Sequence, residues 1–456
     1  MDSAQPRCPV AVRTPWAGRA ALILATALCV LGIKLWLIGR YGSAVPFWDQ
    51  WDAEADFLYR PYLRGELRLA DLFAFHNEHR IFWTRALSLA ELRAYGSWQP
   101  LFQMSINAVL HAGAIGLLVA MVGSALTRGR FLVLCAISLA VFAIPFGWEN
   151  TLNAFHANWY FLILFGLIAL WLVIGHSAFS YRWSIGTLIA AADYLTSASG
   201  ALTPLVMSMV CTAQASVGRR KGRSEWIGII ALLALSLLAI ADVLRNARRG
   251  METQDLGQFY AALVAAAAYP FTDGGVGAVL LLYAPVIALA VWTLRAGPPL
   301  SDGRWMILGV TLWAACQTAT IAYGRPPETI LSPRYLDIYL IVTVSALASA
   351  LALLDGKRRS VTIVAALWMV VVLAALGMHW TDAFSGIEQK GDQGRKHLES
   401  VRSYLRSGNI ADLMPPHQIP YPVPSRLAAV ISVPEIRNIL PRALQPEAAG
   451  GVAGRP

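Results

Sequence analysis

Four carboxylates stand close together in the sequence FWDQWDAEAD at positions 47–56. If this segment is helical, Asp49, Asp52 and Asp56 share one face through the spacing i, i+3 and i+7. Like charges on one helical face repel each other, so helix stability does not explain the pattern, which favours a chemical role. The alternative interpretation is a solvated acidic turn, anchored at a membrane surface by its two tryptophans.

A second polar segment, HNEHR at 76–80, combines two histidines, a carboxylate and an arginine. His76, Glu78 and His79 are residue types that ligate metals, but their spacing matches no strong metal signature. Because His79 and Arg80 are hydrogen-bond donors, the segment better fits the binding of sugar hydroxyls or phosphate. The alternative is that these side chains only cap and pack a neighbouring helix.

Polar and aromatic side chains alternate in WENTLNAFH at 148–156. Rings stack on the apolar faces of sugars while amides and carboxylates bind hydroxyl groups. Glu149, Asn153 and His156 are therefore candidate carbohydrate ligands. The alternative is an aromatic belt at the membrane interface with ordinary polar turns.

Two arginines stand near the start of an apolar run: Arg325, and Arg334 in the sequence SPRY at 332–335. A guanidinium group at a helix mouth can bind a phosphate through two parallel hydrogen bonds. The alternative is that these side chains extend to lipid headgroups.

The composition identifies the setting of these residues. Of 456 residues, 57% are hydrophobic and only 14% charged, and the mean hydropathy is +0.53. Soluble domains carry roughly 25% charged residues, so lipid must be part of the solvent of this chain. The net charge of +10 is typical of basic cytoplasmic loops and does not indicate nucleic-acid binding. The five cysteines form no CxxC and predict neither a disulfide framework nor a metal site.

Apolar runs long enough to cross a hydrocarbon core of ~30 Å predict an all-α protein with about eleven transmembrane helices. The runs fall at 19–39, 101–126, 131–147, 159–176, 184–197, 201–216, 225–244, 275–294, 304–323, 336–353 and 361–379. The pair 184–197 and 201–216 is the least regular, because small polar residues interrupt it. The first run has no clear cleavage site, so we interpret it as a retained span. Arginine and lysine in alternate loops place the N-terminus inside the cell and the C-terminal tail outside.

The four polar segments all fall outside the cell in this topology. The first outer loop, 40–100, is long, and its stretch 81–95 has the spacing of a helix lying on the membrane surface. We therefore divide the chain into a transmembrane domain, 1–379, and a small outer tail, 380–456. Within the tail, helical spacing predicts helices at 386–408 and 433–440.

The order of these motifs resembles that of a known superfamily. The acidic motif FWDQWD follows the first span. After it come, in order, HNEHR, WENTLNAFHANWYF, SPRY and IPYPVPSRLAAVISVPEIRNILP. This is similar to a largely uncharacterised bacterial group of GT-C glycosyltransferases, and the resemblance covers most of the chain. It implies a GT-C-like fold and transfer of a sugar from a polyprenyl-phosphate donor to an acceptor hydroxyl on a glycan, lipid or protein. It also implies a multi-pass protein of the bacterial inner membrane with a periplasmic active site, serving cell-envelope glycan or glycoprotein assembly.

The resemblance assigns roles to particular residues. An aspartate of the first outer loop would be the catalytic base, which here means Asp49 or Asp52. We prefer Asp49, since it lies closer to the membrane. The donor phosphate would bind Arg334, with Arg325 and Arg80 in support. Many members of the superfamily have adjacent acidic residues, whereas here two residues separate the pair, so participation of a divalent cation stays open.

Three other functions fit parts of the pattern. A transporter or flippase of lipid-linked sugars would need ionisable residues near the bilayer midplane, where the sequence offers only Asp193 and His111. A ligase or polymerase of whole glycans would use outer arginines without an acidic motif after the first span. A membrane scaffold would use the tail as its interaction module.

Overall fold

The computed structural model describes residues 16–246, 255–272, 274–354, 359–415 and 419–445. Eight helices in these ranges are long and apolar enough to cross a membrane. They are α1 (Trp16–Tyr41), α4 (Pro100–Gly123), α7 (Ala157–Ile174), α10 (Arg223–Asn246), α12 (Gly275–Ala296), α13 (Gly303–Gly324), α14 (Pro333–Leu353) and α15 (Arg359–Met378). The chain is therefore a helical multi-pass membrane protein, as the composition predicts.

Three shorter helices coincide with the other predicted spans: α5 (Arg128–Ala143), α8 (Tyr181–Tyr194) and α9 (Thr203–Ser216). A further short apolar helix, α11 (Leu256–Ala268), falls where the sequence predicted only a loop. Every predicted apolar run is thus helical, while the count of eleven spans stays a prediction. Helix α14 is the most enclosed, with 94% of its apolar window buried, and it packs against α12, α13, α4 and α5.

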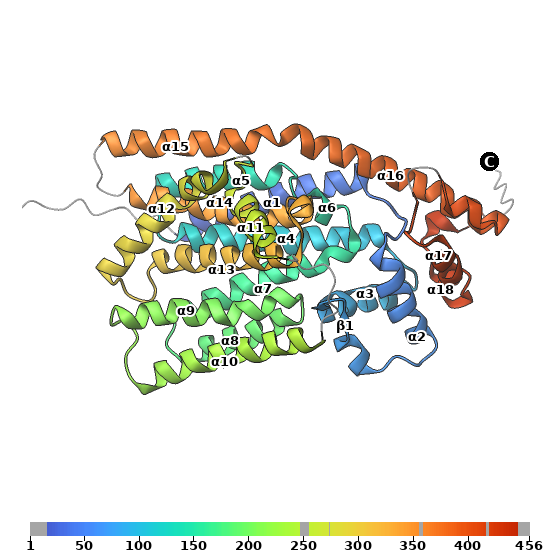
Figure 1. Ribbon diagram of the computed structural model, residues 1–456, viewed down its shortest axis with the longest axis horizontal. Helices are drawn as coiled ribbons and strands as arrows, with labels where there is room; N and C mark the ends of the chain where they lie inside the picture. The colour runs from blue at the N-terminus through green and yellow to red at the C-terminus, as the bar shows by residue number, and fades with distance from the viewer. Residues whose placement is uncertain (1–15, 247–254, 273, 355–358, 416–418, 446–456) are drawn as a thin grey trace, which may run out of the picture.

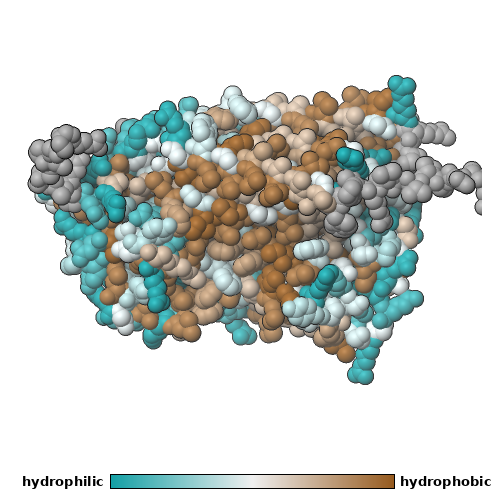
Figure 2. Space-filling model, turned by 180° about the vertical axis from the view of Figure 1, so that it is seen from behind, coloured by the Kyte–Doolittle hydropathy of each residue, from teal (hydrophilic) through white to brown (hydrophobic). Residues whose placement is uncertain are grey.

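The loops gather at two opposite ends of the helical bundle (Figure 1). One end, here called the polar end, carries residues 42–99, 380–415 and 419–445, and there the backbone N–H of Trp98 donates to the carbonyl of Ile439. The other, the basic end, carries the described parts of the loops predicted to be inside, and there Arg19 donates to the carbonyl of Leu126. Figure 2 shows a broad hydrophobic band between two hydrophilic ends. The predicted inner and outer loops are therefore separated in space.

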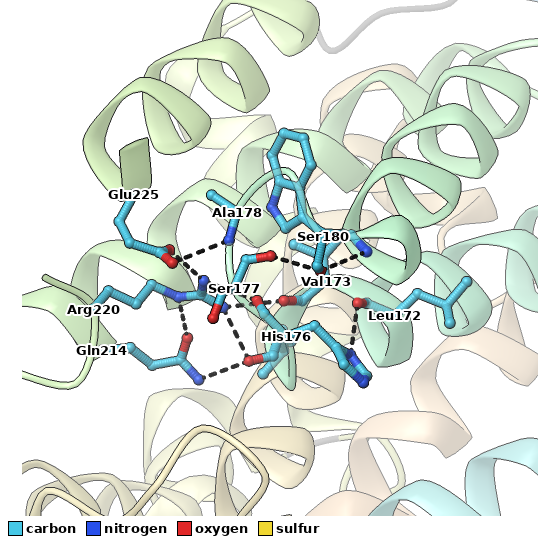
Figure 3. A network of polar contacts seen from close by, with 11 residues as sticks. Leu172, Val173, His176, Ser177, Ala178, Ser180, Gln214, Arg220 and Glu225 are labelled. Atoms are coloured by element: carbon cyan, nitrogen blue, oxygen red, sulfur yellow. Dashed lines mark hydrogen bonds and ion pairs between the residues drawn. The ribbon is translucent and has the colours of Figure 1, made fainter. Parts of the chain in front are cut away.

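A buried arginine organises the basic end (Figure 3). Arg220 pairs with Glu225 at 2.7 Å and donates to the side-chain oxygen of Gln214 at 2.7 Å. It also donates to the carbonyls of Val173 and Ile174, at 3.0 and 3.1 Å. These carbonyls belong to the end of α7, where the regular i+4 backbone donors run out. The backbone N–H of His176 also donates to Val173, and the Gln214 amide donates to Ile174. Arg220 therefore caps one helix while joining it to the start of α10.

Replacing Arg220 by methionine should destabilise the protein by about 3–5 kcal/mol, because Glu225 and the carbonyls of α7 lose their buried partner. The measurement is thermal unfolding in detergent. Arg223→Met is the matched control, since Arg223 is exposed in the same loop region. Equal melting temperatures for the two variants would contradict this role.

The first outer loop folds into short elements. They are η1 (Gln50–Tyr59), a π-helix; α2 (Arg60–Leu63); η2 (Leu69–Phe73); the hairpin strands β1 (Phe75–His76) and β2 (His79–Arg80); and α3 (Phe82–Tyr95). The predicted helix over 81–95 is confirmed. Its buried residues are mostly polar (Thr84, Arg85, Ser88 and Glu91), and Leu92 joins the hydrophobic core that η1 also enters. Its place on a membrane surface stays a prediction.

The two helices predicted in the tail are confirmed as α16 (Trp380–Ser407) and α18 (Pro434–Ile439), and a third helix that was not predicted, α17 (Pro424–Ile431), lies between them. Helices α15 and α16 form one stretch of 49 residues. At 1.5 Å per residue this is about 74 Å, far longer than a ~30 Å hydrocarbon core, so only the apolar α15 can lie in the membrane. The tail shares a hydrophobic core with the first outer loop, in which Trp51 and Trp98 meet Val401 and Ile436. These two parts of the sequence therefore form one body at the polar end.

Candidate functional site at the polar end

The acidic segment presents two faces. Asp49, Asp52 and Asp56 line a pocket of about 890 Å³ formed mainly by the first outer loop, to which Arg426 of the tail and Asn246 of α10 each contribute one side chain. On the opposite face, Gln50 and Glu54 are buried. The prediction that the three aspartates share a face is confirmed, and the fourth carboxylate of the segment points away from them.

Glu54 is held by neutral donors alone. Ser88 and Gln103 donate to its Oε1 at 2.8 and 2.9 Å, and Gln50 and Trp98 donate to its Oε2 at 2.8 and 3.1 Å. Burial raises the pKa of Glu54, and these four hydrogen bonds counteract the rise. The residue therefore joins the acidic segment to α3, to α4 and to the turn between them.

Glu54→Ala should lower stability by about 2–4 kcal/mol, because it leaves several buried donors without an acceptor. The variant should also expose the first outer loop to proteolysis before the membrane helices unfold. Thermal unfolding together with limited proteolysis of 42–99 measures both effects. Glu66→Ala removes an exposed carboxylate from the same loop and serves as the control. If both variants behave alike, Glu54 does not hold the loop.

Asp49 sits at the start of η1, just after a strained residue. Trp48 has a φ of 41°, in the left-handed region that costs a large side chain energy. The Asp49 carboxylate makes no hydrogen bond or ion pair with the residues that the structure describes. Loss of water on its protein side raises the pKa of Asp49; His76 and Arg334 oppose the rise, while Asp52 and Glu78 add to it. Asp49 is thus an unpaired carboxylate within electrostatic reach of a guanidinium group from α14.

Asp52 is already engaged. Arg426 pairs with it and also lies 3.6 Å from Asp56, and Tyr421 donates a hydrogen bond to it. Both partners come from the tail and had no signal in the sequence that we recognised. Of the two candidate bases, only Asp49 has a carboxylate available to a substrate.

The hairpin of β1 and β2 separates the residues of HNEHR. Asn77, with a φ of 53°, makes the turn, and His76 pairs with His79 across the strands. His76 faces the pocket. Glu78 pairs with Arg325 at 2.9 Å. The structure therefore does not bring the whole motif to one site.

His79 and Arg80 point to other partners. His79 accepts a hydrogen bond from the backbone N–H of Ala198 at 3.2 Å, and burial lowers its pKa to about 4. Arg80 pairs with Asp242 at 2.7 Å and donates to the hydroxyl of Tyr194 at 3.2 Å. His79 thus joins the first outer loop to the turn after α8, and Arg80 joins it to the ends of α8 and α10.

The three predicted phosphate ligands differ in how far they are engaged. Arg80 is neutralised by Asp242, and Arg325 by Glu78 and by a 2.9 Å hydrogen bond to the hydroxyl of Tyr335. In the described part of the chain, the single carboxylate that Arg334 contacts is Glu149 at 3.6 Å, its guanidinium also lies 5.2 Å from the centre of the Tyr335 ring, and its Nε is buried without a hydrogen-bond partner. Arg334 is therefore the most available of the three.

The WENTLN segment lies against the start of α14. Asn150 donates to the carbonyl of Arg334 at 2.8 Å and to the carboxylate of Asp337 at 3.0 Å. His156 lies between Asn150 and Asn153, at 3.0 and 3.1 Å from their amide groups. Of the predicted carbohydrate ligands in this segment, Glu149 faces Arg334, while Asn153 and His156 are buried and already hydrogen-bonded to each other.

Beneath this segment lies a charged cluster that we did not predict. Lys34 of α1 donates to Thr151 at 2.7 Å, and Asp337 of α14 lies 3.7 Å from His111 of α4. All three ionisable side chains are buried. Only His111 was noticed in the sequence; the signal for the other two was a charge inside an apolar span.

Metal ligation has no geometric support in the described part of the chain. No group of three or more His, Cys, Asp or Glu side chains there could hold a metal ion. The HNEHR segment, in particular, directs its histidines to different neighbours, His76 to the pocket and His79 to Ala198. The site therefore combines an unpaired carboxylate, an underused arginine and a polar pocket. Neither protein-family models nor curated proteins give a match to this sequence.

Proposed function

We propose that the protein is a glycosyltransferase that moves a sugar from a polyprenyl-phosphate donor to an acceptor hydroxyl, with inversion at the anomeric carbon. The observation that carries this proposal is an Asp49 carboxylate that makes no hydrogen bond or ion pair with the described residues and lies within electrostatic reach of Arg334. The Nε of Arg334 is itself buried without a partner in the described part of the chain. The order of motifs, which resembles that of the GT-C superfamily, supports the same conclusion.

The reaction needs one proton acceptor and one site for a phosphate. As the acceptor oxygen attacks the anomeric carbon, Asp49 takes the hydroxyl proton. The bond between the anomeric carbon and the phosphate oxygen breaks, and its electron pair leaves with the polyprenyl phosphate. The Arg334 guanidinium stabilises the negative charge that grows on this leaving group.

In this proposal, the donor and the acceptor reach the site from two different sides. The donor's prenyl chain would lie in lipid beside the bundle, with its phosphate at the start of α14. The acceptor, a glycan, lipid or protein group, would reach Asp49 from the polar pocket that His76 and Asp52 also line. This arrangement fits a periplasmic active site in the bacterial inner membrane.

The other predicted ligands take supporting roles in this proposal. Arg426 and Tyr421 hold Asp52 as part of the pocket wall. Glu78 and Arg325 hold the hairpin against the loop before α14. Because Arg80 is paired with Asp242, we no longer assign it to the donor phosphate.

A transporter remains the second candidate, because Lys34, His111 and Asp337 form a buried ionisable cluster. The positions of Lys34 and Asp337 argue against a midplane relay, although His111 stands midway along α4. Lys34 lies seven residues, or about 10 Å, before the end of α1 at Tyr41, and Asp337 lies about 6 Å from the start of α14. Lys34 and Asp337 are thus near the polar end, and they join the candidate site through Thr151 and Asn150.

Asp49→Asn should reduce transfer by a factor of about 10²–10⁴ with the fold intact, the usual contribution of a positioned base. Arg334→Ala should reduce it by about 10²–10³ and weaken donor binding as well. The assay is transfer from synthetic polyprenyl-phosphate sugars by purified protein in detergent, where no second compartment exists and a transporter has no activity. Asp392→Asn, on the exposed side of α16, is the control. Normal transfer by folded Asp49→Asn and Asp52→Asn variants would exclude the mechanism.

The pH profile of transfer should reflect the raised pKa of Asp49. Asp49 accepts a proton only when ionised, so kcat/KM should fall as the pH drops through this pKa, above the ordinary aspartate value of about 3.9. The measurement is kcat/KM against pH under saturating acceptor. An acid limb at or below the ordinary value would show that a different group is the base.

A further inference from the structure

Glu149 stands between two cationic side chains from distant parts of the chain. Its carboxylate lies 3.6 Å from Arg334, at the start of α14, and it attracts Lys390 of α16. The contact with Arg334 is longer than an ordinary charge-assisted hydrogen bond of about 2.7–2.9 Å. Two cations thus share one loosely held anion.

Three glycines bring α16 close enough for Lys390 to reach this place. A Cβ at Gly386 would lie 2.7 Å from the Trp148 ring, one at Gly391 3.0 Å from Tyr41, and one at Gly394 2.8 Å from Ser43. Tyr41 ends α1, so this part of α16 lies at the level where the membrane-spanning helices end. In a bilayer, the ends of spanning helices lie near the lipid headgroups, so a lipid phosphate would be expected at this level.

Lys390 is also next to the segment that carries Asp49. Its Nζ lies 3.0 Å from the centre of the Phe47 ring, two residues before Asp49, and it donates to the side-chain oxygen of Gln393 at 3.3 Å. Neither contact neutralises the ammonium charge. The buried Nε of Arg334 has no hydrogen-bond partner among the described residues, so two cations whose charge is incompletely balanced stand near Glu149.

We propose that Lys390 and Arg334 together bind the phosphate of a prenyl phosphodiester and that Glu149 is the internal anion which this phosphate displaces. This inference rests on the proposed function and names a second phosphate ligand for it. Without substrate, Glu149 keeps the two cations near each other. A phosphodiester brings a single negative charge and several acceptor oxygens to the same place.

Burial lowers the pKa of Lys390 to about 7, although Glu149 attracts its charge. The other titratable groups that face Lys390 are His397 and His156. Burial lowers the pKa of His397 to about 4, and both ring nitrogens of His156 are hydrogen-bonded to amides. Lys390 is therefore the group whose charge changes near neutral pH, and the bound anion would favour its protonated form.

The test is binding of farnesyl methyl phosphate to the full-length protein in detergent, from about pH 6 to about pH 9. A phosphodiester lacks the second phosphate proton, with its pKa of about 6, so changes in affinity report on the protein. Affinity for the wild-type protein should fall as the pH rises through the pKa of Lys390. Dimethyl phosphate serves as the second probe and should bind at least tenfold more weakly, since it has no prenyl chain.

Four variants separate the roles. Lys390→Met should weaken binding roughly tenfold at the acid end and abolish the pH dependence, since one charge-assisted contact is lost. Lys390→Arg should bind well at every pH, because arginine stays charged. Glu149→Gln should bind more tightly than the wild-type protein, as no internal anion competes. Lys396→Met, at an exposed position of the same helix, should behave like the wild-type protein.

The outcomes distinguish this inference from the proposed function. Binding that depends on Arg334 but is the same in Lys390→Met and Glu149→Gln would overturn only the inference. Equal affinity for dimethyl phosphate would overturn the assignment to a prenyl lipid. If the wild-type protein binds no farnesyl methyl phosphate, both the inference and the proposed donor fail.

Discussion

The polar end depends on one buried carboxylate. An isolated charge removed from water is costly, yet Glu54 is enclosed by Trp98, Ser88, Gln103 and Gln50 with no cation beside it. Such a site is tolerable only if every donor is in place at once. The first outer loop is therefore held in one arrangement relative to α3 and α4. That arrangement turns Asp49, Asp52 and Asp56 together toward the pocket.

Whether a charged side chain already has a partner distinguishes residues that look equivalent in the sequence. Three arginines were candidates for a phosphate, and two of them have a carboxylate within 2.9 Å. Bringing a phosphate to either would break an existing pair and leave a partly buried carboxylate alone. Arg334 differs because its position at the start of the enclosed helix α14 gives it a distant anion and an unsatisfied Nε. The availability of a charge, rather than its presence, marks the candidate site.

Much of the fold could be predicted from the sequence because burial in lipid is a local property. A run of about 20 apolar residues must form a helix whatever its neighbours are, and each predicted run does so here. The common face of Asp49, Asp52 and Asp56 was predictable for a similar reason. The partners were not: Arg426 is 374 residues from Asp52, and Asp242 is 162 residues from Arg80. No local pattern determines such contacts, so nothing in the sequence indicated that Arg80 is paired with Asp242 or that Lys390 lies beside Phe47.

Two charged side chains inside the helical bundle support the candidate site from below. Lys34 and Asp337 would each be costly in an apolar span, and the structure places both directly under the WENTLN segment. There they bind Thr151 and Asn150, two neighbouring side chains on the underside of the segment. Asn150 in turn donates to the carbonyl of Arg334. The preceding residue, Glu149, faces the guanidinium group of Arg334. Asp337 also packs where a side chain on Gly147 would stand, since an added Cβ would lie 2.4 Å from its carboxylate. A lysine and an aspartate in the membrane therefore fix the position of the anion and the arginine above them.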